Sequence, residues 1–401
     1  MELTPKDALA LRMTSLLLAR RSQRLPAGPD HDVAGVVTWF GAMQAQDLNS
    51  VLWSLGARLP GRTVTDVQDA LERRDAVRTW PMRGTVHLVP AEDAGWMLEL
   101  MGSRTLAGAA RRRAGLGIGD ATADRAVDVL GAALAGGGRL TRAQCIATLE
   151  GAGISCSGQV GYHLLWYASQ RGVTCIAPNV GAEQTFVLLD EWVPHPARPE
   201  RDEALATMAH RYFRSHGPTT RQDFAGWTGL TAADAKRGIA AAGGALVATQ
   251  LEGREVFVES PLAEAHASEP VRLGGDEILA LPGFDEYLLG FKDRALMLAA
   301  DHKQAIIPGG NGVFQPTLVR AGRVVATWKR SLVRGRTRVV VRPLVVLTAP
   351  DRVRATAAFE AYAAFTGRLI DDVSFDGPLR PGRTGTRRGA AATPGLPDRR
   401  H

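Results

Sequence analysis

The stretch "HGPTTRQDFAGWTGLTAADAKRGIAAAGGALVATQLEGREVFV", residues 216–258, decides the fold. Thr220 is a typical N-cap and begins one helix, "WTGL" supplies a glycine turn, and Thr231 caps a second helix. Two β-like runs follow, "ALVATQL" and "EVFVE", with a short turn between them. A helix, a turn, a second helix and a hairpin in this order predict a winged helix.

The same order of elements precedes this stretch twice. "GRLTRAQCIATLEGAGISCSGQVGYHLLWYASQRGVTCIAP", residues 138–178, predicts a helix from Thr141, a second helix and a strand. Closer to the N-terminus, Thr4 and Pro5 begin a first helix, and "AVRTW" and "GTVHLV" are β-like. Between them, helices are expected at residues 32–43, 48–58 and 65–74, the last capped by Thr65.

Beyond Pro270 the pattern changes to short β-like runs separated by Gly and Pro, which indicates a small β-barrel or a curled sheet. The helix "DRVRATAAFEAYAAFTG" is expected to pack against it. The predicted class is α+β, with tandem winged-helix domains and a C-terminal β-barrel-like domain. The predicted domains are residues 1–115 (N-terminal helices and first winged helix), 116–200 (second winged helix), 201–262 (third), 263–377 (β-rich, with a hairpin) and 378–401 (a disordered basic tail).

Composition narrows the classes of function. The chain has 401 residues, 45% hydrophobic content and a formal net charge of +7, which fits a polyanionic partner. No apolar run is long enough to span a bilayer and no signal-peptide layout is present, so a cytoplasmic protein is expected, associated with the nucleoid when bound to DNA. A monomer is also expected. Cys145, Cys156 and Cys175 lack metal or disulfide spacing and are expected to be buried thiols. No nucleotide-binding or nucleophile-elbow motif is present, and no cofactor or metal is expected.

The stretch "WFGAMQAQDLNS", residues 39–50, places Gln44 and Gln46 where an apolar helical pattern breaks off. On a helix the two side chains would diverge, but in an extended segment they project to the same side. Together they offer donors and acceptors that can hold a water molecule, a sugar or a base edge. The alternative is that they only cap a helix or hydrogen-bond a loop.

Four nearby residues are candidates for supporting roles. Asp47 and Asn49 are first expected to cap the next helix, although the Asp47 carboxylate is also close enough to stabilise a cationic sugar. His87 lies on a predicted strand, where a single histidine is more often structural than catalytic, and Arg83 favours a polar face there.

Several other polar residues suggest contacts with DNA. The run Arg111, Arg112 and Arg113 is a candidate phosphate clamp, and Arg221 and Gln222 begin a helix that can lie over a phosphate or a groove.

The adjacent acidic residues Asp285 and Glu286 could suggest a metal site. They lack further ligands at metal spacing, so an ion-pair network is expected instead of a metal site.

Five segments in this order resemble the AlkZ-like (YcaQ-like) winged-helix DNA glycosylases over roughly residues 5–375. They are "MQAQD", "VRTWPMRGTVHLVPAED", "GQVGYHLLWYASQRG", "LPGFDEYLLGFKDR" and "NGVFQPTLVRAGRVVATWKR". The resemblance implies that Gln44 and Gln46 are catalytic, with Ala45 at the apolar position between them. It implies excision of alkylated purines from double-stranded DNA, including bulky natural-product adducts and interstrand crosslinks, in repair or self-resistance. It also implies a hairpin that enters the DNA groove, placed at residues 320–323 with Arg320 and Arg323.

A purine alkylated at N7 or N3 is already cationic, so its glycosidic bond breaks without a general acid. Two amides then suffice to hold water beside C1′ and to stabilise the developing positive charge on the sugar. The main alternative is a winged-helix transcription regulator without catalysis, because winged helices more often read DNA than act on it. A catalytically inactive scaffold protein is a second alternative.

Overall fold

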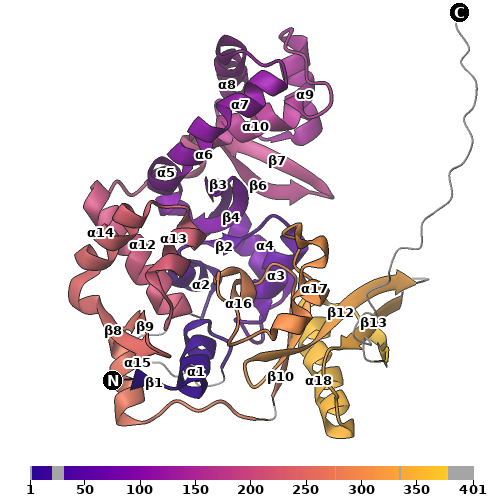
Figure 1. Cartoon of the computed structure of the whole chain (residues 1–401). Coiled ribbons are helices and arrows are strands. Elements are labelled where there is room, and N and C mark those ends of the chain that lie inside the picture. Colours follow the sequence, from indigo (N-terminus) through magenta and orange to yellow (C-terminus); the bar gives the residue numbers. More distant parts are fainter. Residues whose placement is uncertain (1, 20–30, 276, 334–335, 378–401) are drawn as a thin grey trace, which may run out of the picture.

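The computed structural model describes residues 2–19, 31–275, 277–333 and 336–377, and Figure 1 shows the whole chain. The tail 378–401, for which disorder is predicted, lies outside the described residues. Three β-sheets, with helices packed around them, make up the described part. The mixture of both element types confirms the α+β class.

Four helices precede and follow the short segment that carries the two glutamines. They are α1 (Pro5–Ser15), α2 (Val33–Phe40), α3 (Leu48–Gly56) and α4 (Val64–Glu72). Thr4 caps α1 as predicted, but the cap of α4 is Thr63 rather than Thr65. Thr63 and Asp66 exchange hydrogen bonds in a capping box, which leaves Thr65 inside the helix.

The central sheet has six strands in the order β2-β4-β3-β6-β7-β5. The two predicted wings, β3–β4 and β6–β7, are joined by an antiparallel pairing of Arg78 with Ile176. This sheet crosses the predicted boundary at residue 115, and the division of the chain into winged-helix domains stays a prediction. The strands are β2 (Met43–Gln44), β3 (Ala76–Met82), β4 (Thr85–Pro90), β5 (Leu140–Thr141), β6 (Thr174–Val180) and β7 (Glu183–Leu188).

The helices that accompany this sheet follow the predicted order. Thr141 caps α9 as predicted, and α10 then leads into the hairpin β6–β7. Their bounds are α5 (Ala94–Met97), α6 (Ser103–Gly108), α7 (Ala110–Gly115), α8 (Asp120–Leu134), α9 (Arg142–Gly151), α10 (Val160–Gln170) and α11 (Leu189–Trp192).

The stretch at residues 216–258 folds as its sequence indicates. Thr220 caps α13 and Thr231 caps α14, and the hairpin β8–β9 follows. The N-terminal strand β1 pairs in parallel with β8, so the start of the chain completes this small sheet. The bounds are β1 (Glu2–Leu3), α12 (Arg201–His216), α13 (Arg221–Thr228), α14 (Ala232–Ala242), β8 (Leu246–Leu251), β9 (Arg254–Glu259) and α15 (Ser260–Ser268).

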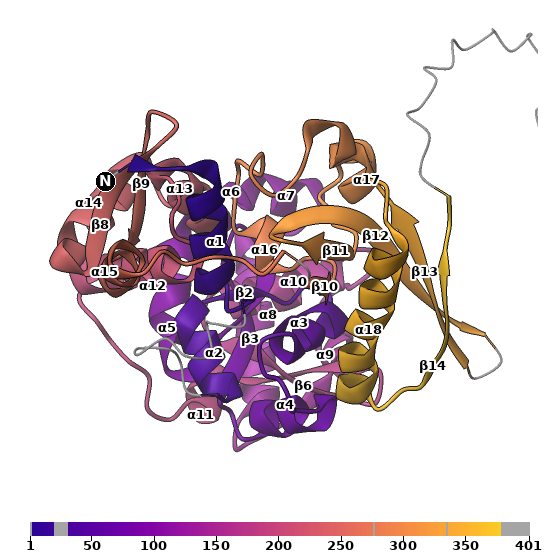
Figure 2. The same ribbon diagram turned by 90° about the horizontal axis from the view of Figure 1, so that it is seen from below.

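The C-terminal sheet is open, so the predicted barrel is wrong. Its strands follow the order β10-β11-β12-β13-β14, and among the described residues β10 and β14 are its unpaired edges. Figure 2 shows α18 lying along this sheet, where Phe359 and Tyr362 pack on Trp328. The sheet therefore buries its apolar side on a helix instead of closing on itself. The bounds are β10 (Ile278–Leu281), α16 (Glu286–Leu289), α17 (Lys303–Ile306), β11 (Thr317–Arg320), β12 (Arg323–Val333), β13 (Arg336–Pro343), α18 (Ala349–Thr366) and β14 (Ile370–Phe375).

The prediction about the cysteines can be checked at this level. Cys145, Cys156 and Cys175 are free and buried, as expected. Within the described ranges, no helix has the length and apolarity needed to cross a membrane.

Candidate active site

The segment from Met43 to Gln46 alternates between the protein interior and the surface. Met43 and Ala45 are buried, with 1% and 2% of their surface exposed, whereas Gln44 is half-buried and Gln46 is exposed. Alternating burial is the mark of an extended segment, in which every second side chain lies on the same side. The two carboxamides therefore share the outward face, and the Ala45 methyl group belongs to the core.

Gln46 is held by its own side chain. The Ala45 N–H donates to the Val86 carbonyl at 2.8 Å, and the Val86 N–H donates to Oε1 of Gln46 at 3.1 Å. Oε1 of Gln46 thus takes the place of a backbone carbonyl as the acceptor for the Val86 N–H and extends the hydrogen-bond ladder between β2 and β4. Its Nε2 hydrogens remain available as donors on the outward side.

Gln44 is held by its backbone instead. Its N–H donates to Oε1 of Glu286 at 2.9 Å, in α16 of the C-terminal region. Its half-buried carboxamide has no hydrogen-bond partner in the described part of the chain. The Gln44 side chain is therefore free to bind a water molecule or a substrate atom.

Asp47 caps α3, as first expected. Its Oδ2 accepts the Ser50 N–H at 2.9 Å and the Ser50 hydroxyl at 2.5 Å. Asn49 is exposed in the first turn of the same helix and does not act as the cap. The Asp47 cap thus holds the start of α3 in place directly after the glutamines.

His87 lies directly across the ladder from Gln44 and is fully buried. Its Nδ1–H donates to the Thr85 carbonyl at 2.9 Å, and its Nε2 lies 3.3 Å from the Arg83 guanidinium and accepts from it. Burial and the nearby Arg83 charge lower the pKa of His87 to about 4. Arg83 itself has a left-handed backbone (φ +55°) in the turn between β3 and β4. His87 is therefore neutral at physiological pH.

The acidic pair in "FDEY" has two separate roles. Asp285 forms the expected ion pair, since both of its oxygens accept from the Arg58 guanidinium, at 2.8 and 2.9 Å. Glu286 instead reaches the backbone of Gln44, and sequence reasoning missed it as a site residue. The available signal was two adjacent carboxylates inside the otherwise apolar run "LPGFDEYLL".

Glu286 is ionised although only 1% of its surface is exposed. Burial opposes the charge, but hydrogen bonding and attraction from His216 and the hydrogen bond from the Gln44 N–H outweigh it and hold the pKa at about 2. A fixed negative charge therefore lies directly behind the peptide group of Gln44.

The basic run of α7 is divided between surface and interior. Arg111 and Arg112 are exposed, and Arg112 also bonds to Gln159. Arg113 is 8% exposed and binds Asp120, so it stabilises the fold and is not a surface phosphate clamp. Only the first two arginines of the run face solvent.

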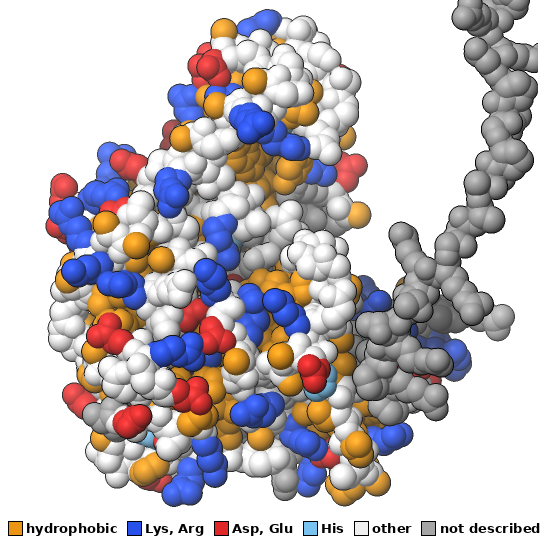
Figure 3. All heavy atoms as spheres, in the orientation of Figure 1, with side chains coloured by type: hydrophobic (Ala, Val, Ile, Leu, Met, Phe, Trp, Pro, Cys, Tyr) orange, Lys and Arg blue, Asp and Glu red, His pale blue; other side chains and the backbone are white. Residues whose placement is uncertain are grey.

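Arg221 and Gln222 are exposed in the first turn of α13, where a helix N-terminus adds positive potential. Figure 3 shows Lys and Arg side chains, interspersed with Asp and Glu, across the middle of this face of the molecule. This distribution is compatible with a polyanion that lies across the face.

The turn at residues 320–323, predicted to enter the DNA groove, divides its two arginines between a structural role and the surface, and its entry into a groove stays a prediction. Arg320 pairs with Asp351 of α18 at 2.6 Å, and a hydroxyl from Tyr287 binds the Gly322 carbonyl. Gly322 is buried between Leu9 of α1 and Tyr287 of α16, Arg320 and Ala321 are half-buried, and Arg323 is exposed. The hairpin that projects from the body is β12–β13, with exposed Lys329, Arg330, Arg336 and Arg338 (Figures 1 and 2).

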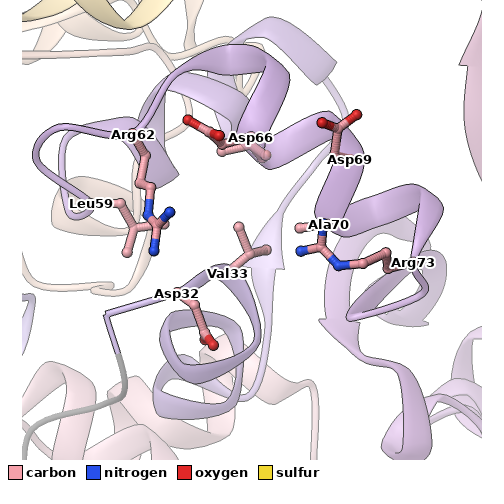
Figure 4. A pocket seen from close by; sticks show the side chains of 9 residues that line it. Asp32, Val33, Leu59, Arg62, Asp66, Asp69, Ala70 and Arg73 are labelled. Atoms are coloured by element: carbon pink, nitrogen blue, oxygen red, sulfur yellow. The ribbon is translucent and has the colours of Figure 1, made fainter.

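A cavity of about 130 Å³ lies elsewhere, between the start of α2 and α4. Figure 4 shows the guanidinium groups of Arg62 and Arg73 and the carboxylates of Asp32, Asp66 and Asp69 around it. Neither glutamine lines this cavity. Within the described ranges, no group of His, Cys, Asp and Glu side chains is arranged to hold a metal ion.

Comparison with known proteins places the chain in a family. The family model "DNA glycosylase AlkZ-like" matches residues 37–365. The chain is 30% identical over 388 residues to the interstrand DNA cross-link repair glycosylase of Streptomyces sahachiroi, covering 90% of this chain and 95% of that protein. It also shares its fold with the solved structure of Streptomyces sahachiroi DNA glycosylase AlkZ, with a TM-score of 0.74, 24% identity and coverage of 94% of this chain and 100% of the other. The chain therefore belongs to the AlkZ-like DNA glycosylase family.

Proposed function

We propose that this chain is a monofunctional glycosylase that removes purines alkylated at N7 or N3 from double-stranded DNA. Its substrates include bulky natural-product adducts and interstrand crosslinks through such a base. The name of the Streptomyces sahachiroi relative supports the crosslink as a substrate class. The observation that carries the proposal is the free carboxamide of Gln44 on the same face as the anchored carboxamide of Gln46.

The groups around the glutamines fit a reaction that needs no acid. His87 is neutral and its Nε2 lone pair faces Arg83, Glu286 is ionised, and Asp47 caps a helix. None of them presents an acidic proton toward a leaving group. A cationic N-alkylpurine does not require one, because the electron pair of the breaking C1′–N bond neutralises the base as it leaves.

In the proposed reaction, the two carboxamides hold a water molecule beside C1′. The C1′–N bond breaks first, an oxocarbenium-like sugar develops, and the water oxygen bonds to C1′ and releases its proton to solvent. The Gln44 and Gln46 carboxamides orient the water, and each well-placed dipole in a preorganised site is worth about 3 kcal/mol of barrier. Asp47, on the same loop, adds negative charge near the developing cation.

The exposed basic residues are proposed to hold the duplex. Arg111, Arg221 and Arg323 supply phosphate contacts, with Gln222 at the start of α13 and Arg112 beside Arg111. The projecting strands β12 and β13 add Lys329 and Arg338. A base tied to the opposite strand cannot flip into a closed pocket, so an outward-facing pair of glutamines suits a crosslinked substrate.

The test is release of the base. Duplex DNA carrying an N7-alkylguanine is incubated with wild type, Gln44→Ala and Gln46→Ala, and abasic sites are counted after mild base treatment. Wild type should release the base and both variants should be much slower. No release by wild type from a set of N7- and N3-alkylated duplexes, or equal rates in all three proteins, contradicts the proposal.

A transcription regulator on the same scaffold makes a different prediction. It would protect one defined sequence in a footprinting experiment on undamaged DNA. The glycosylase should bind many sequences with similar affinity and should prefer duplexes that carry an adduct.

A further inference from the structure

The carboxylate of Glu286 connects three parts of the chain at the candidate active site. Its Oε1 accepts the Gln44 peptide N–H at 2.9 Å, and its Oε2 accepts the indole N–H of Trp227 at 2.9 Å. Nε2 of His216 lies 3.4 Å from the same Oε2. Trp227 and His216 are buried, with 2% and 0% of their surface exposed, and Gln44 is half-buried.

The hydrogen on His216 follows from this contact. An ionised carboxylate only accepts hydrogen bonds, so Nε2 of His216 must carry the hydrogen that faces Glu286. The imidazole ring is held in place by stacking on Tyr212, with ring centroids 4.6 Å apart. Gly290 closes the other side, because a Cβ there would lie 2.1 Å from the His216 ring. Glu286 thus accepts from three donors, of which the His216 ring is fixed by its neighbours.

The element that carries Glu286 is fixed in turn to the N-terminal helices. Phe284 adopts a left-handed backbone (φ +60°), an uncommon conformation for a large side chain that turns the chain into α16. The next residue, Asp285, is clamped by Arg58 at the end of α3. Because α3 begins directly after the glutamines, the two ends of the segment Gln44–Arg58 are tied to Glu286 and Asp285, the first residue and the N-cap of α16.

We propose that Glu286 is the positioning residue of the active site: by holding the Gln44 peptide N–H, it fixes where the Gln44 carboxamide stands relative to C1′. This inference rests on the proposed function. Gln44 needs such a support because its side chain has no protein partner in the described part of the chain. A displacement of about 1 Å of a catalytic group can slow a reaction about 10²-fold, so loss of the anchor should slow base release by about this factor.

Asp223 offers a matched control within the same region. It is also buried, at 3% exposed, and its Oδ1 also accepts peptide N–H groups across elements, from Lys292 at 2.8 Å and Asp293 at 3.2 Å. It joins α13 to the C-terminal region without a contact to Gln44. Replacement of either carboxylate removes a buried acceptor, but only one of the two changes reaches the site.

Glu286→Gln removes the Gln44 contact selectively. The single amide oxygen should turn toward the two donors on the Oε2 side, Trp227 and His216, which leaves the new NH₂ group opposite the Gln44 N–H. The chain contains a single Met–Gln pair, Met43–Gln44, so labelling with carbonyl-¹³C Met and ¹⁵N Gln gives one NMR signal for the Gln44 amide. In wild type this amide should be downfield and slow to exchange, and in Glu286→Gln it should move upfield and exchange faster.

The kinetic arm compares single-turnover base release, DNA affinity and thermal stability in wild type, Glu286→Gln and Asp223→Asn. We expect Glu286→Gln to lose about 10²-fold in rate with DNA affinity little changed, and Asp223→Asn to lose stability with its rate retained. Rates that fall in proportion to stability in both variants, or a Glu286→Gln rate equal to wild type, overturn the inference. If Glu286→Gln does not fold, a Gln44 amide in wild type that is upfield and unprotected also overturns it. Absence of base release by wild type is a failure of the proposed function, and the NMR arm still decides whether Glu286 holds Gln44.

Discussion

The peptide N–H of Val86 donates to Oε1 of Gln46, so this glutamine supports the sheet with the same group that faces the candidate substrate. Gln44, on the same face, contributes its backbone to the fold and keeps its side chain free of protein partners in the described ranges. Two residues of identical chemistry therefore carry different structural duties. Replacing each glutamine in turn should therefore distinguish an effect on base release from an effect on the free energy of unfolding.

Gln46→Ala should lower the free energy of unfolding by about 1 kcal/mol, because the Val86 N–H loses its acceptor. Gln44→Ala should leave stability close to wild type, although both variants lose base release. Urea unfolding of the three proteins measures the difference. Gln46→Glu is the matched control, since a carboxylate still accepts from Val86 but has no N–H to donate. Equal destabilisation by Gln44→Ala and Gln46→Ala would contradict the assignment.

Local sequence signals predicted much of the fold. Thr141, Thr220 and Thr231 cap their helices as predicted, because an N-cap depends on a side chain and the three residues that follow it. The placement of Gln44 and Gln46 on one side of an extended segment could likewise be predicted, because the helical pattern breaks off there. Each of these features is decided within one turn of chain.

Contacts between distant segments account for what the sequence analysis missed. Glu286 and Gln44 are 242 residues apart, and no periodicity or motif links them. The pairing of Arg78 with Ile176, which merges two hairpins into one sheet, also joins residues that are far apart in the sequence and that no local pattern links. Arg113 and Arg320 are of a residue type that commonly contacts DNA. Their carboxylate partners, Asp120 and Asp351, are apparent only in the three-dimensional structure. Charge alone therefore could not separate surface arginines from structural ones.

The two arginines Arg338 and Arg320 should differ in their effects on DNA binding. Arg338 is exposed on the projecting strand β13, so Arg338→Gln should reduce the salt dependence of DNA binding by about 0.9 in slope, the value for one lost phosphate contact. Arg320 is paired with Asp351, so Arg320→Gln should lower stability and leave that slope unchanged. Binding titrations over a series of salt concentrations measure both. A smaller slope in Arg320→Gln together with an unchanged slope in Arg338→Gln would contradict this division and make Arg320 a phosphate contact.

Stability should fall on acidification in two separate windows. The pKa of His87 is lowered from 6.5 to about 4, chiefly by burial and then by the Arg83 charge, while the charge of Glu286 and the Thr85 carbonyl oppose the shift. Between these pH values the unfolded chain binds a proton that the folded chain does not, so stability decreases as the pH falls from 6.5 to about 4. Glu286, with a pKa lowered from 4.5 to about 2, adds its own loss only below about 4.5.

His87→Gln should therefore weaken the dependence of stability on pH between 6.5 and about 4 and leave the dependence below about 4.5 that comes from Glu286. The imidazole contributes up to about 3 kcal/mol of the pH-dependent change, the equivalent of the shift from 6.5 to about 4. Urea midpoints measured across this range for wild type, His87→Gln and His195→Gln test the assignment, because His195 is exposed and serves as the control. Wild type and His195→Gln should lose stability in parallel as the pH falls, and His87→Gln should lose less. Three parallel profiles would show that protonation of His87 does not oppose folding, and the neutral histidine beside Arg83 would have to be abandoned.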